Sequence, residues 1–253
     1  MIDELFITGA GVSTESGIPT FRGSDGFWTI GNKNYAPQEM ATRKTYLEKP
    51  GEFLLWYYKR FAKYKDVKHN LTHKWLSDKH LVTQNIDGLD EKAGNKNYIP
   101  IHGRLDKLIH YDDEMKMQTP INACWETIEK DGPLSDRDLK TALLKKFKIY
   151  PSKNKKLSPE CGISLKPFVL LFDEYYTELY RFSEAKNWMV SAKKIIFMGT
   201  SFNVNITSIA LSIAIQKGIT IEIVDPIPVK IPYDLVIYHE MSSNDYCLSR
   251  NKG

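Results

Sequence analysis

The stretch Leu5-Phe6-Ile7-Thr8-Gly9-Ala10-Gly11-Val12-Ser13 decides the fold class of this 253-residue chain. A short apolar run is typical of a buried strand, and the glycines after it favour a tight turn before a helix begins near Ser13. A strand, a glycine turn and a helix N-terminus form the start of a nucleotide-binding βα unit. We therefore predict a Rossmann-like α/β domain with Gly9, Ala10 and Gly11 on the phosphate side of a bound nucleotide.

Three further apolar runs end in small or polar residues. They are Leu81-Val82-Thr83 before Gln84-Asn85-Ile86-Asp87-Gly88, Ile195-Ile196-Phe197-Met198 before Gly199-Thr200-Ser201, and Ile221-Glu222-Ile223-Val224 before Asp225-Pro226. Open parallel sheets bind their ligands at the carboxyl ends of their strands. The pattern predicts a parallel sheet with helices on both faces and a ligand site at that edge.

Two stretches break the alternation of strands and helices. In the first, about 29–69, the aromatic residues Phe53, Trp56, Tyr57, Tyr58 and Phe61 indicate an amphipathic helix. The second, about 106–164, is polar and lysine-rich, and Ser135 is the predicted N-cap of its one helix. We assign both stretches to one small inserted module, and residues 1–28, 70–105 and 165–253 to the Rossmann-like core of a single catalytic domain.

Composition indicates an ordinary globular protein, with 42% hydrophobic and 26% charged residues and a net charge of +4. No apolar run approaches the roughly 20 residues of a membrane helix, and strand-like residues follow Met1 too closely for a signal peptide. Three scattered cysteines suit a reducing compartment, so we expect a cytoplasmic protein without a membrane partner. The lysines of 145–156 are either a solvated face or a surface for nucleic acid or acidic peptide, and we favour the solvated face.

The glycine turn extends into Gly9-Ala10-Gly11-Val12-Ser13-Thr14-Glu15-Ser16-Gly17-Ile18-Pro19-Thr20-Phe21-Arg22-Gly23, which closely resembles the sirtuin signature. Further blocks follow in the sirtuin order: Thr83-Gln84-Asn85-Ile86-Asp87-Gly88-Leu89, Ile101-His102-Gly103 and Gly199-Thr200-Ser201-x-x-Val204. The resemblance spans most of the chain, from Gly9 to about Asp225. It implies a protein lysine deacylase that consumes NAD and an acylated lysine, and that yields nicotinamide, O-acyl-ADP-ribose and free lysine.

The resemblance also implies the residues that bind NAD: Gly9, Ala10, Gly11, Ser13, Thr20, Phe21, Arg22, Gln84, Asn85, Asp87, Gly199, Thr200, Ser201, Val224 and Asp225. The Arg22 guanidinium can hold phosphate or ribose oxygens while Phe21 covers the sugar. Asn85 and Asp87 supply amide and carboxylate groups for the nicotinamide carboxamide. They can equally cap a turn, and the two roles are compatible. Asp225 stands where the family often has asparagine, which could alter the affinity for NAD.

His102 is the predicted catalytic base. It follows the apolar Tyr98-Ile99-Pro100-Ile101 and precedes Gly103, so its imidazole is expected at a strand end. An imidazole with a pKa near 6.5 can take a proton from a ribose hydroxyl near neutral pH. The sirtuin His-Gly motif implies this role, with Asn85 and Asp87 beside it.

Two features bear on the acyl-peptide. Leu170-Leu171-Phe172-Asp173-Glu174 lies where sirtuins carry a Phe-Gly-Glu loop that pairs with the peptide, so Phe172 and Glu174 are implied substrate residues. Asp173 replaces the glycine, which puts peptide docking in doubt. Tyr57 and Arg60 stand three apart on the expected helix and resemble the pair of sirtuins that remove succinyl groups. The same spacing also fits an ordinary amphipathic helix.

The zinc site of most sirtuins is not expected here. Where the family has two CxxC pairs, this chain has His110-x-x-Asp113 and Ser158-x-x-Cys161, a poor zinc ligand set. Two alternatives to deacylation stay open. The same pocket could serve an NAD-glycohydrolase or ADP-ribosyltransferase, or an inactive module that binds NAD or ADP-ribose.

Overall fold

The computed structural model describes residues 1–20, 37–129, 132–152 and 156–251. Internal contacts divide the chain into two compact units. The first comprises 1–21, 67–102 and 180–253, and the second comprises 22–66 and 103–179. Residues 165–179, assigned to the core from the sequence, group with the second unit because the strand at their start pairs with a strand of that unit.

The first unit is built on a six-stranded sheet with the order β3-β2-β1-β7-β8-β9. The strands are β1 (Ile2–Thr8), β2 (His80–Thr83), β3 (Tyr98–Pro100), β7 (Ala192–Met198), β8 (Thr220–Val224) and β9 (Val236–His239). Every neighbouring pair is parallel, so the carboxyl ends of all the strands lie at one edge. The predicted Rossmann-like sheet is confirmed.

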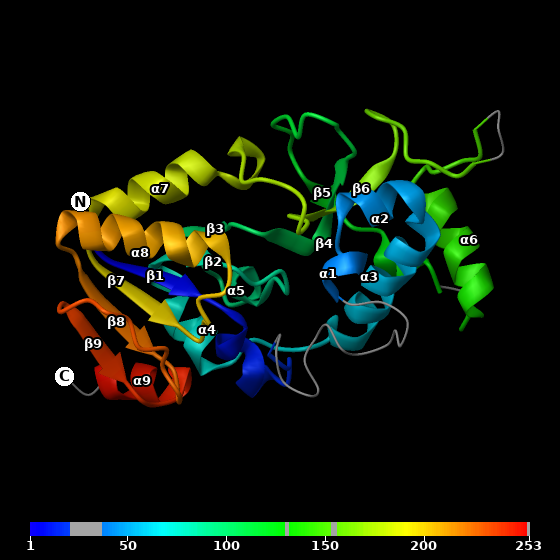
Figure 1. Cartoon of the computed structure of the whole chain (residues 1–253). Helices are drawn as coiled ribbons and strands as arrows, with labels where there is room; N and C mark the ends of the chain where they lie inside the picture. Colours follow the sequence, from blue (N-terminus) through cyan, green and yellow to red (C-terminus); the bar gives the residue numbers. More distant parts are fainter. Residues whose placement is uncertain (21–36, 130–131, 153–155, 252–253) are drawn as a thin grey trace. The chain divides into compact units, whose positions relative to one another are not determined.

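Helices cover both faces of this sheet, with α7 and α8 on one face and α4 and α9 on the other (Figure 1). The helices of the unit are α4 (Leu71–Trp75), α5 (Leu89–Lys92), α7 (Phe182–Ser191), α8 (Asn205–Lys217) and α9 (Ser243–Arg250), with the 3₁₀ helices η1 (Ala10–Ser16) and η2 (Leu76–Asp78). A further 3₁₀ turn, η4 (Glu178–Tyr180), leads into α7. Burial on both faces explains why β1 reads as a continuous apolar run rather than an alternating one.

Alternate residues of β1 define the two halves of the core. Phe6 faces α9 and packs in a buried cluster with Ile196, Val224 and Tyr246. Its ring meets the edge of Trp75 at 5.4 Å between centroids, a favourable aromatic geometry. Leu5 and Ile7, which are fully buried, point to the opposite face. This double packing fixes β1 at the centre of the sheet, and with it the turn that follows.

That turn differs in detail from the prediction. The chain enters a 3₁₀ helix at Ala10 instead of starting an α-helix near Ser13. The helix ends at Gly17, whose φ of +85° is accessible to glycine without strain. The cause is a close backbone approach, because Gly11 N donates to Gly199 O at 2.9 Å and tightens the chain before a regular α-helical turn can form.

The second unit contains a three-stranded antiparallel sheet with the order β5-β4-β6. Its strands are β4 (Gly103–His110), β5 (Ile121–Asn122) and β6 (Leu165–Val169), none of which was predicted from the sequence. Its helices are α1 (Pro37–Met40), α2 (Arg43–Glu48), α3 (Pro50–Tyr64) and α6 (Asp136–Lys146), with the 3₁₀ turn η3 (Trp125–Thr127). The predicted amphipathic helix is α3, and Ser135 caps α6 by accepting from Asp138 N.

The core of the second unit is aromatic. Trp125 is fully buried, packs on Phe147 at 4.9 Å and on Phe61 at 6.0 Å, and donates its indole N–H to Leu105 O at 2.7 Å. Trp125 thereby joins α3, β4 and the end of α6. Across the described residues of both units, no helix is long and apolar enough to cross a bilayer.

Candidate functional site

Three glycines interlock at the carboxyl edge of the sheet in the first unit. A Cβ on Gly9 would lie 2.7 Å from Gly199 O, and one on Gly11 would lie 2.6 Å from Gly199 Cα. Gly199 itself has a φ of +60° and would meet Val12 N at 2.7 Å. Only glycine fits at these positions, so the turn after β1 presents bare backbone, which is what close approach to a pyrophosphate requires.

A buried serine joins the two predicted nicotinamide residues. Ser13 Oγ donates to Asp87 Oδ2 at 2.8 Å and accepts from Asn85 Nδ2 at 3.2 Å. Asn85 Nδ2 also donates to Gly9 O at 3.1 Å, and Asp87 Oδ1 accepts from Leu89 N at the start of α5. Segments more than seventy residues apart in sequence thus meet in one hydrogen-bond network. Asp87 Oδ1 thus caps α5, while Oδ2 accepts from the Ser13 hydroxyl. The turn-capping role of Asp87 is therefore compatible with a role in the site.

His73 is a member of this network that the sequence analysis missed. The imidazole is fully buried on α4, with Nε2 3.4 Å from Ser13 Oγ and Nδ1 2.9 Å from Asn70 Oδ1. Burial lowers the pKa of His73 to about 4, while the carboxylate of Asp87 raises it. The neutral ring therefore backs Ser13 at neutral pH. The one local signal for it is the N-cap Asn70 three residues earlier, because its partner Ser13 lies sixty residues away.

His102 lies just after β3 with its ring oriented by the backbone. Nδ1 is 3.0 Å from Gln84 O, and since a carbonyl oxygen can only accept, Nδ1 carries the proton. The lone pair is consequently on Nε2. Burial lowers the pKa of His102 to about 4, and the Gln84 carbonyl opposes that shift by raising it. His102 is thus a neutral imidazole in one defined tautomer at neutral pH, as a general base requires.

The remaining predicted NAD residues of this unit line the same strand ends. Gln84 Nε2 donates to Thr200 Oγ1 at 3.2 Å, linking the ends of β2 and β7. Val224 is fully buried, Ser201 is exposed, and Asp225 Oδ1 accepts from Ile227 N in the turn after β8. Thr20 is half-buried beyond η1, and Phe21 and Arg22 lie outside the described residues.

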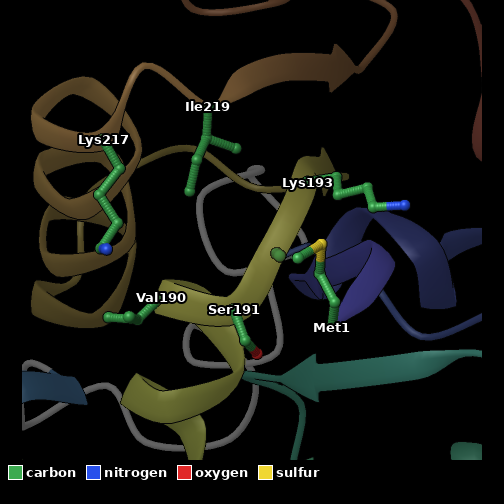
Figure 2. A pocket seen from close by; sticks show the side chains of 7 residues that line it. Met1, Val190, Ser191, Lys193, Lys217 and Ile219 are labelled. Carbon is green, nitrogen blue, oxygen red and sulfur yellow. The ribbon is translucent and has the colours of Figure 1, made fainter.

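A hollow of about 460 Å³ lies at the opposite, amino edge of this sheet (Figure 2). Met1, Ala192 and Ile219 line it where β1, β7 and β8 begin, with Lys193 and Lys217 beside them. Lys193 is already paired with Asp3 at 2.7 Å. The hollow includes none of the predicted site residues.

The interlocked glycines, the Ser13 network and the oriented His102 are accompanied by a match of the Sir2 family to residues 9–206. The chain belongs to the Sir2 family. An NAD-dependent protein deacylase 1 of Caldanaerobacter subterraneus subsp. tengcongensis is 29% identical over 252 residues, covering 96% of this chain and 90% of that protein. An NAD-dependent protein deacylase of Thermus thermophilus is 30% identical over 233 residues, covering 88% of this chain and 78% of that protein.

Solved Sir2 structures share the fold. The crystal structure of a Sir2 homolog–NAD complex has a TM-score of 0.71 and 26% identity, covering 98% of this chain and 88% of that chain. A complex of a mutant Sir2 homologue with ADP-ribose has a TM-score of 0.72 at the same identity, covering 98% of this chain and 91% of that one. The fold is therefore that of Sir2 proteins over nearly the whole chain.

In this sirtuin the predicted acyl-reading pair lies on α3 of the second unit. Tyr57 is fully buried, and its hydroxyl has no hydrogen-bond partner among the residues that the structure describes. Arg60 is 3% exposed, donates Nη1 to Trp56 O at 2.8 Å and stacks its guanidinium over the Trp56 ring at 3.3 Å. Burial lowers the pKa of Arg60 to about 9, so the side chain stays charged at neutral pH. On α3, the charged Arg60 guanidinium is thus buried three residues from a Tyr57 hydroxyl that makes no hydrogen bond to a described residue.

Phe172 and Glu174, the predicted peptide residues, are placed very differently. The Phe172 side chain is exposed, whereas the Glu174 carboxylate is buried against the equally buried Lys166 ammonium. Glu174 Oε2 also accepts from Leu171 N at 3.0 Å. The carboxylate therefore stabilises its own segment, and Phe172 is the outward side chain of the two.

The residues at the family's zinc positions do not fit a zinc ion. His110 is exposed, and Asp113 Oδ1 is taken by the Tyr111 hydroxyl and by Arg43 at 3.1 Å. Cys161 is an exposed free thiol. No group of three or more His, Cys, Asp or Glu side chains that could hold a metal ion occurs in the described ranges. The two loops are joined through backbone instead, with Tyr111 N donating to Ser164 O at 2.7 Å and Gly162 N to Tyr111 O at 2.8 Å.

Proposed function

We propose that this sirtuin is an NAD-dependent protein lysine deacylase that releases nicotinamide, O-acyl-ADP-ribose and free lysine. The single observation that carries the proposal is the tautomer of His102. A backbone carbonyl holds its proton on Nδ1 and leaves the basic nitrogen at the strand ends where the family's cofactor binds.

The chain's own residues fit NAD at this edge. Bare backbone at Gly9 and Gly11 accommodates the pyrophosphate, since a Cβ at either position would fill that space. The Asn85 amide and Asp87 carboxylate, fixed by Ser13 and backed by His73, are proposed to recognise the nicotinamide carboxamide. Gln84, Thr200 and Ser201 are proposed to contact the ribose.

When bound, NAD supplies a ribose carbon that accepts the acyl oxygen as nicotinamide departs. His102 Nε2 then takes the proton of a ribose hydroxyl, which makes that oxygen nucleophilic toward the acyl carbon. The hydrogen bond to Gln84 O stabilises the imidazolium that results, because Nδ1 remains a donor after Nε2 is protonated. The Gln84 carbonyl therefore orients the ring and supports its charge.

Product analysis tests the proposal. Purified protein is incubated with NAD and an acetyl-lysine peptide, and the products are separated by chromatography and mass spectrometry. We expect nicotinamide and O-acetyl-ADP-ribose in equal amounts, formed only when the peptide is present. His102→Ala should abolish turnover while NAD still binds, because the imidazole moves a proton and does not hold the cofactor. Wild-type protein that yields no O-acetyl-ADP-ribose would contradict deacylation.

A second candidate is NAD hydrolysis in the same pocket. It is favoured by the burial of Glu174, whose carboxylate is committed to Lys166 and Leu171 N instead of being open to a peptide. Water would then take the place of the acyl oxygen. Free ADP-ribose formed without any peptide is the outcome that distinguishes this activity from deacylation.

An acidic acyl group, such as succinyl, is the proposed specialised substrate. The support comes from α3, where the Arg60 guanidinium is buried and the Tyr57 hydroxyl has no hydrogen-bond partner within the described part of the chain. Together the two groups can bind a carboxylate. An ordinary amphipathic helix would place a charged residue such as Arg60 in solvent. Here Arg60 is as buried as its aromatic neighbours, which favours the binding role.

We further propose that the second unit folds without zinc. The support is that Asp113 is engaged by Tyr111 and Arg43, while the loops around 111 and 162 are tied through backbone hydrogen bonds. A structural zinc site needs four ligands in a closed shell, and the positions that the family uses supply too few here.

A further inference from the structure

The substitution of aspartate for glycine at position 173 has a structural consequence in the second unit. Asp173 Oδ1 accepts from Arg43 N at 2.6 Å, and Oδ2 accepts from Lys44 N at 3.1 Å. These are the first amides of α2, which have no partner within the helix. One side chain thus binds its loop to the beginning of a helix 130 residues earlier in the chain.

Neighbouring backbone groups reinforce this attachment. Phe172 N donates to Ala41 O at 3.0 Å, and Glu174 N donates to Leu171 O at 3.0 Å, closing a turn. The Glu174 side chain completes the turn by accepting from Leu171 N. Each residue from 171 to 174 is therefore fixed by at least one hydrogen bond.

Arg43 connects this segment with the loop that follows β4. Its guanidinium is 3.9 Å from Glu174 Oε1, donates to Asp112 O at 2.9 Å and pairs with Asp113 Oδ1 at 3.1 Å. It also lies over the Tyr111 ring, 5.1 Å from the centroid. Because Arg43 is 18% exposed and Glu174 is 2% exposed, this pairing is shielded from solvent more than a surface ion pair.

We propose that Arg43 and Asp173 are positioning residues for the acyl-peptide, which hold residues 171–174 in the conformation that docks it. This inference rests on the proposed deacylase function and on the assignment of Phe172 to the peptide side. Anchoring the segment leaves Phe172 and Tyr175 outward, 52% and 80% exposed. A segment that is already ordered loses less entropy on binding, so the gain appears in peptide affinity and not in the chemical step.

Asp173→Ala removes both acceptors and is the primary test. We expect the KM for an acetyl-lysine peptide to rise by about tenfold, with kcat at saturating peptide within about twofold and the Kd for NAD unchanged. Asp173→Asn keeps one acceptor oxygen and should lose less. Arg43→Met is the second variant, and it should fold because Glu174 keeps Lys166. It should raise the same KM.

Ser135→Ala is the matched control, because Ser135 caps α6 of the same unit without touching the segment. It should lower the melting temperature and leave the peptide KM unchanged. A peptide KM unchanged in Asp173→Ala, or raised equally in Ser135→Ala, would reduce Asp173 to a structural cap and overturn the inference.

Direct binding separates this inference from the proposed function. Fluorescence polarisation of a labelled acetyl-lysine peptide, with ADP-ribose in place of NAD, reports docking without turnover. Wild-type binding that Asp173→Ala weakens, in a protein that forms no O-acetyl-ADP-ribose, would retain the positioning role and reject deacylation. Turnover by the wild type, with equal peptide binding by the wild type and Asp173→Ala, would support deacylation and reject the positioning role. Absence of peptide binding by the wild type would reject both the positioning role and deacylation.

Discussion

A single carbonyl decides the chemistry available to His102. Gln84 O holds the proton on Nδ1, and burial lowers the pKa of the ring to about 4, well below the ordinary value near 6.5. The proposed catalytic base is therefore neutral, and able to accept a proton, across the whole physiological pH range. An unperturbed histidine would be partly protonated, and so partly inactive, near pH 6.5.

The pH dependence of turnover follows from that pKa. Because a base works when deprotonated, kcat/KM should stay level as the pH falls through 6.5 and should decline only toward pH 4 to 5. The measurement is kcat/KM for the acetyl-lysine peptide from pH 4 to 8. A decline in kcat/KM centred near pH 6.5 would contradict this prediction, because it would show that burial does not lower the pKa of His102.

Stability must be followed in parallel, since the same shift destabilises the fold in acid. The unfolded chain binds protons at His102 and His73 with a pKa near 6.5, whereas the folded chain does so only near 4. The stability from these neutral rings is complete above about pH 6.5 and is lost as the pH falls through the folded value. The melting temperature measured at each pH shows whether the protein is still folded. Loss of activity in folded protein, regained on return to pH 7, is then assigned to protonation of His102 and not to unfolding.

Arg60 carries a prediction on acyl selectivity. Arg60→Met keeps an apolar stem against Trp56 but removes the charge, so kcat/KM for a succinyl-lysine peptide should fall about tenfold or more. Acetyl-lysine turnover should change far less, because a neutral acyl group has no carboxylate to lose a partner. Lys59→Met, which alters the exposed cation next to it on α3, is the control. Equal loss on both substrates would show a folding defect instead.

At the scale of elements, the central strands were predictable and the second sheet was not. Both faces of the six-stranded sheet are covered, so β1 and β7 contain uninterrupted apolar runs at 5–7 and 195–198. β6 is equally buried but includes Lys166, whose charge is satisfied by Glu174 eight residues later. In the sequence, a lysine indicates a solvent-exposed position unless its buried partner is known. This is why β6 was not predicted from the sequence.

The site was predictable to the same degree and for a similar reason. Gly9, Asn85, Asp87 and His102 each lie within four residues of the end of a strand, so the strand pattern brings them to one edge. His73 lies within a short helix, and its role depends on a contact with Ser13 that no local pattern encodes. The role of such a residue depends on a contact with a segment that is distant in sequence, and it therefore could not be predicted from the sequence.

The close approach of the turns after β1 and β7 can be tested with one methyl group. Gly11→Ala would place a Cβ 2.6 Å from Gly199 Cα, so one backbone must move. We expect a loss of about 1–3 kcal/mol in the free energy of unfolding and a weakened affinity for NAD. Gly51→Ala on α3 is the matched control, since its Cβ would meet Leu144 Cδ1 at an ordinary 3.7 Å. It should leave stability unchanged or raise it by about 0.5–1 kcal/mol. Similar losses in both variants would contradict the interlocked turn.

At the scale of the whole molecule, the proposal that the second unit folds without zinc requires other interactions that stabilise it. Its aromatic residues supply one answer, because Phe61 of α3 and Phe147 at the end of α6 both pack on Trp125 of η3. Arg43 supplies another, by joining α2 to the loop after β4 through Asp113 and Asp112 O. Packing and hydrogen bonds thus connect the segments that a four-cysteine zinc site would otherwise crosslink.

This arrangement predicts a protein that is indifferent to chelators. Protein purified without added metal should contain less than about half an equivalent of zinc, and excess EDTA should not lower its melting temperature, since metal binding contributes to folding only where a site exists.

Cys161→Ser is the matched variant. It removes the one cysteine at the family's ligand positions, which is exposed and free, and should leave the melting temperature unchanged. Arg43→Met, by contrast, should lower it, because the link between α2 and the loop at 111–113 is lost. Stoichiometric zinc by elemental analysis, together with a melting temperature that falls on chelation and in Cys161→Ser, would show that a metal holds this unit and that the guanidinium does not.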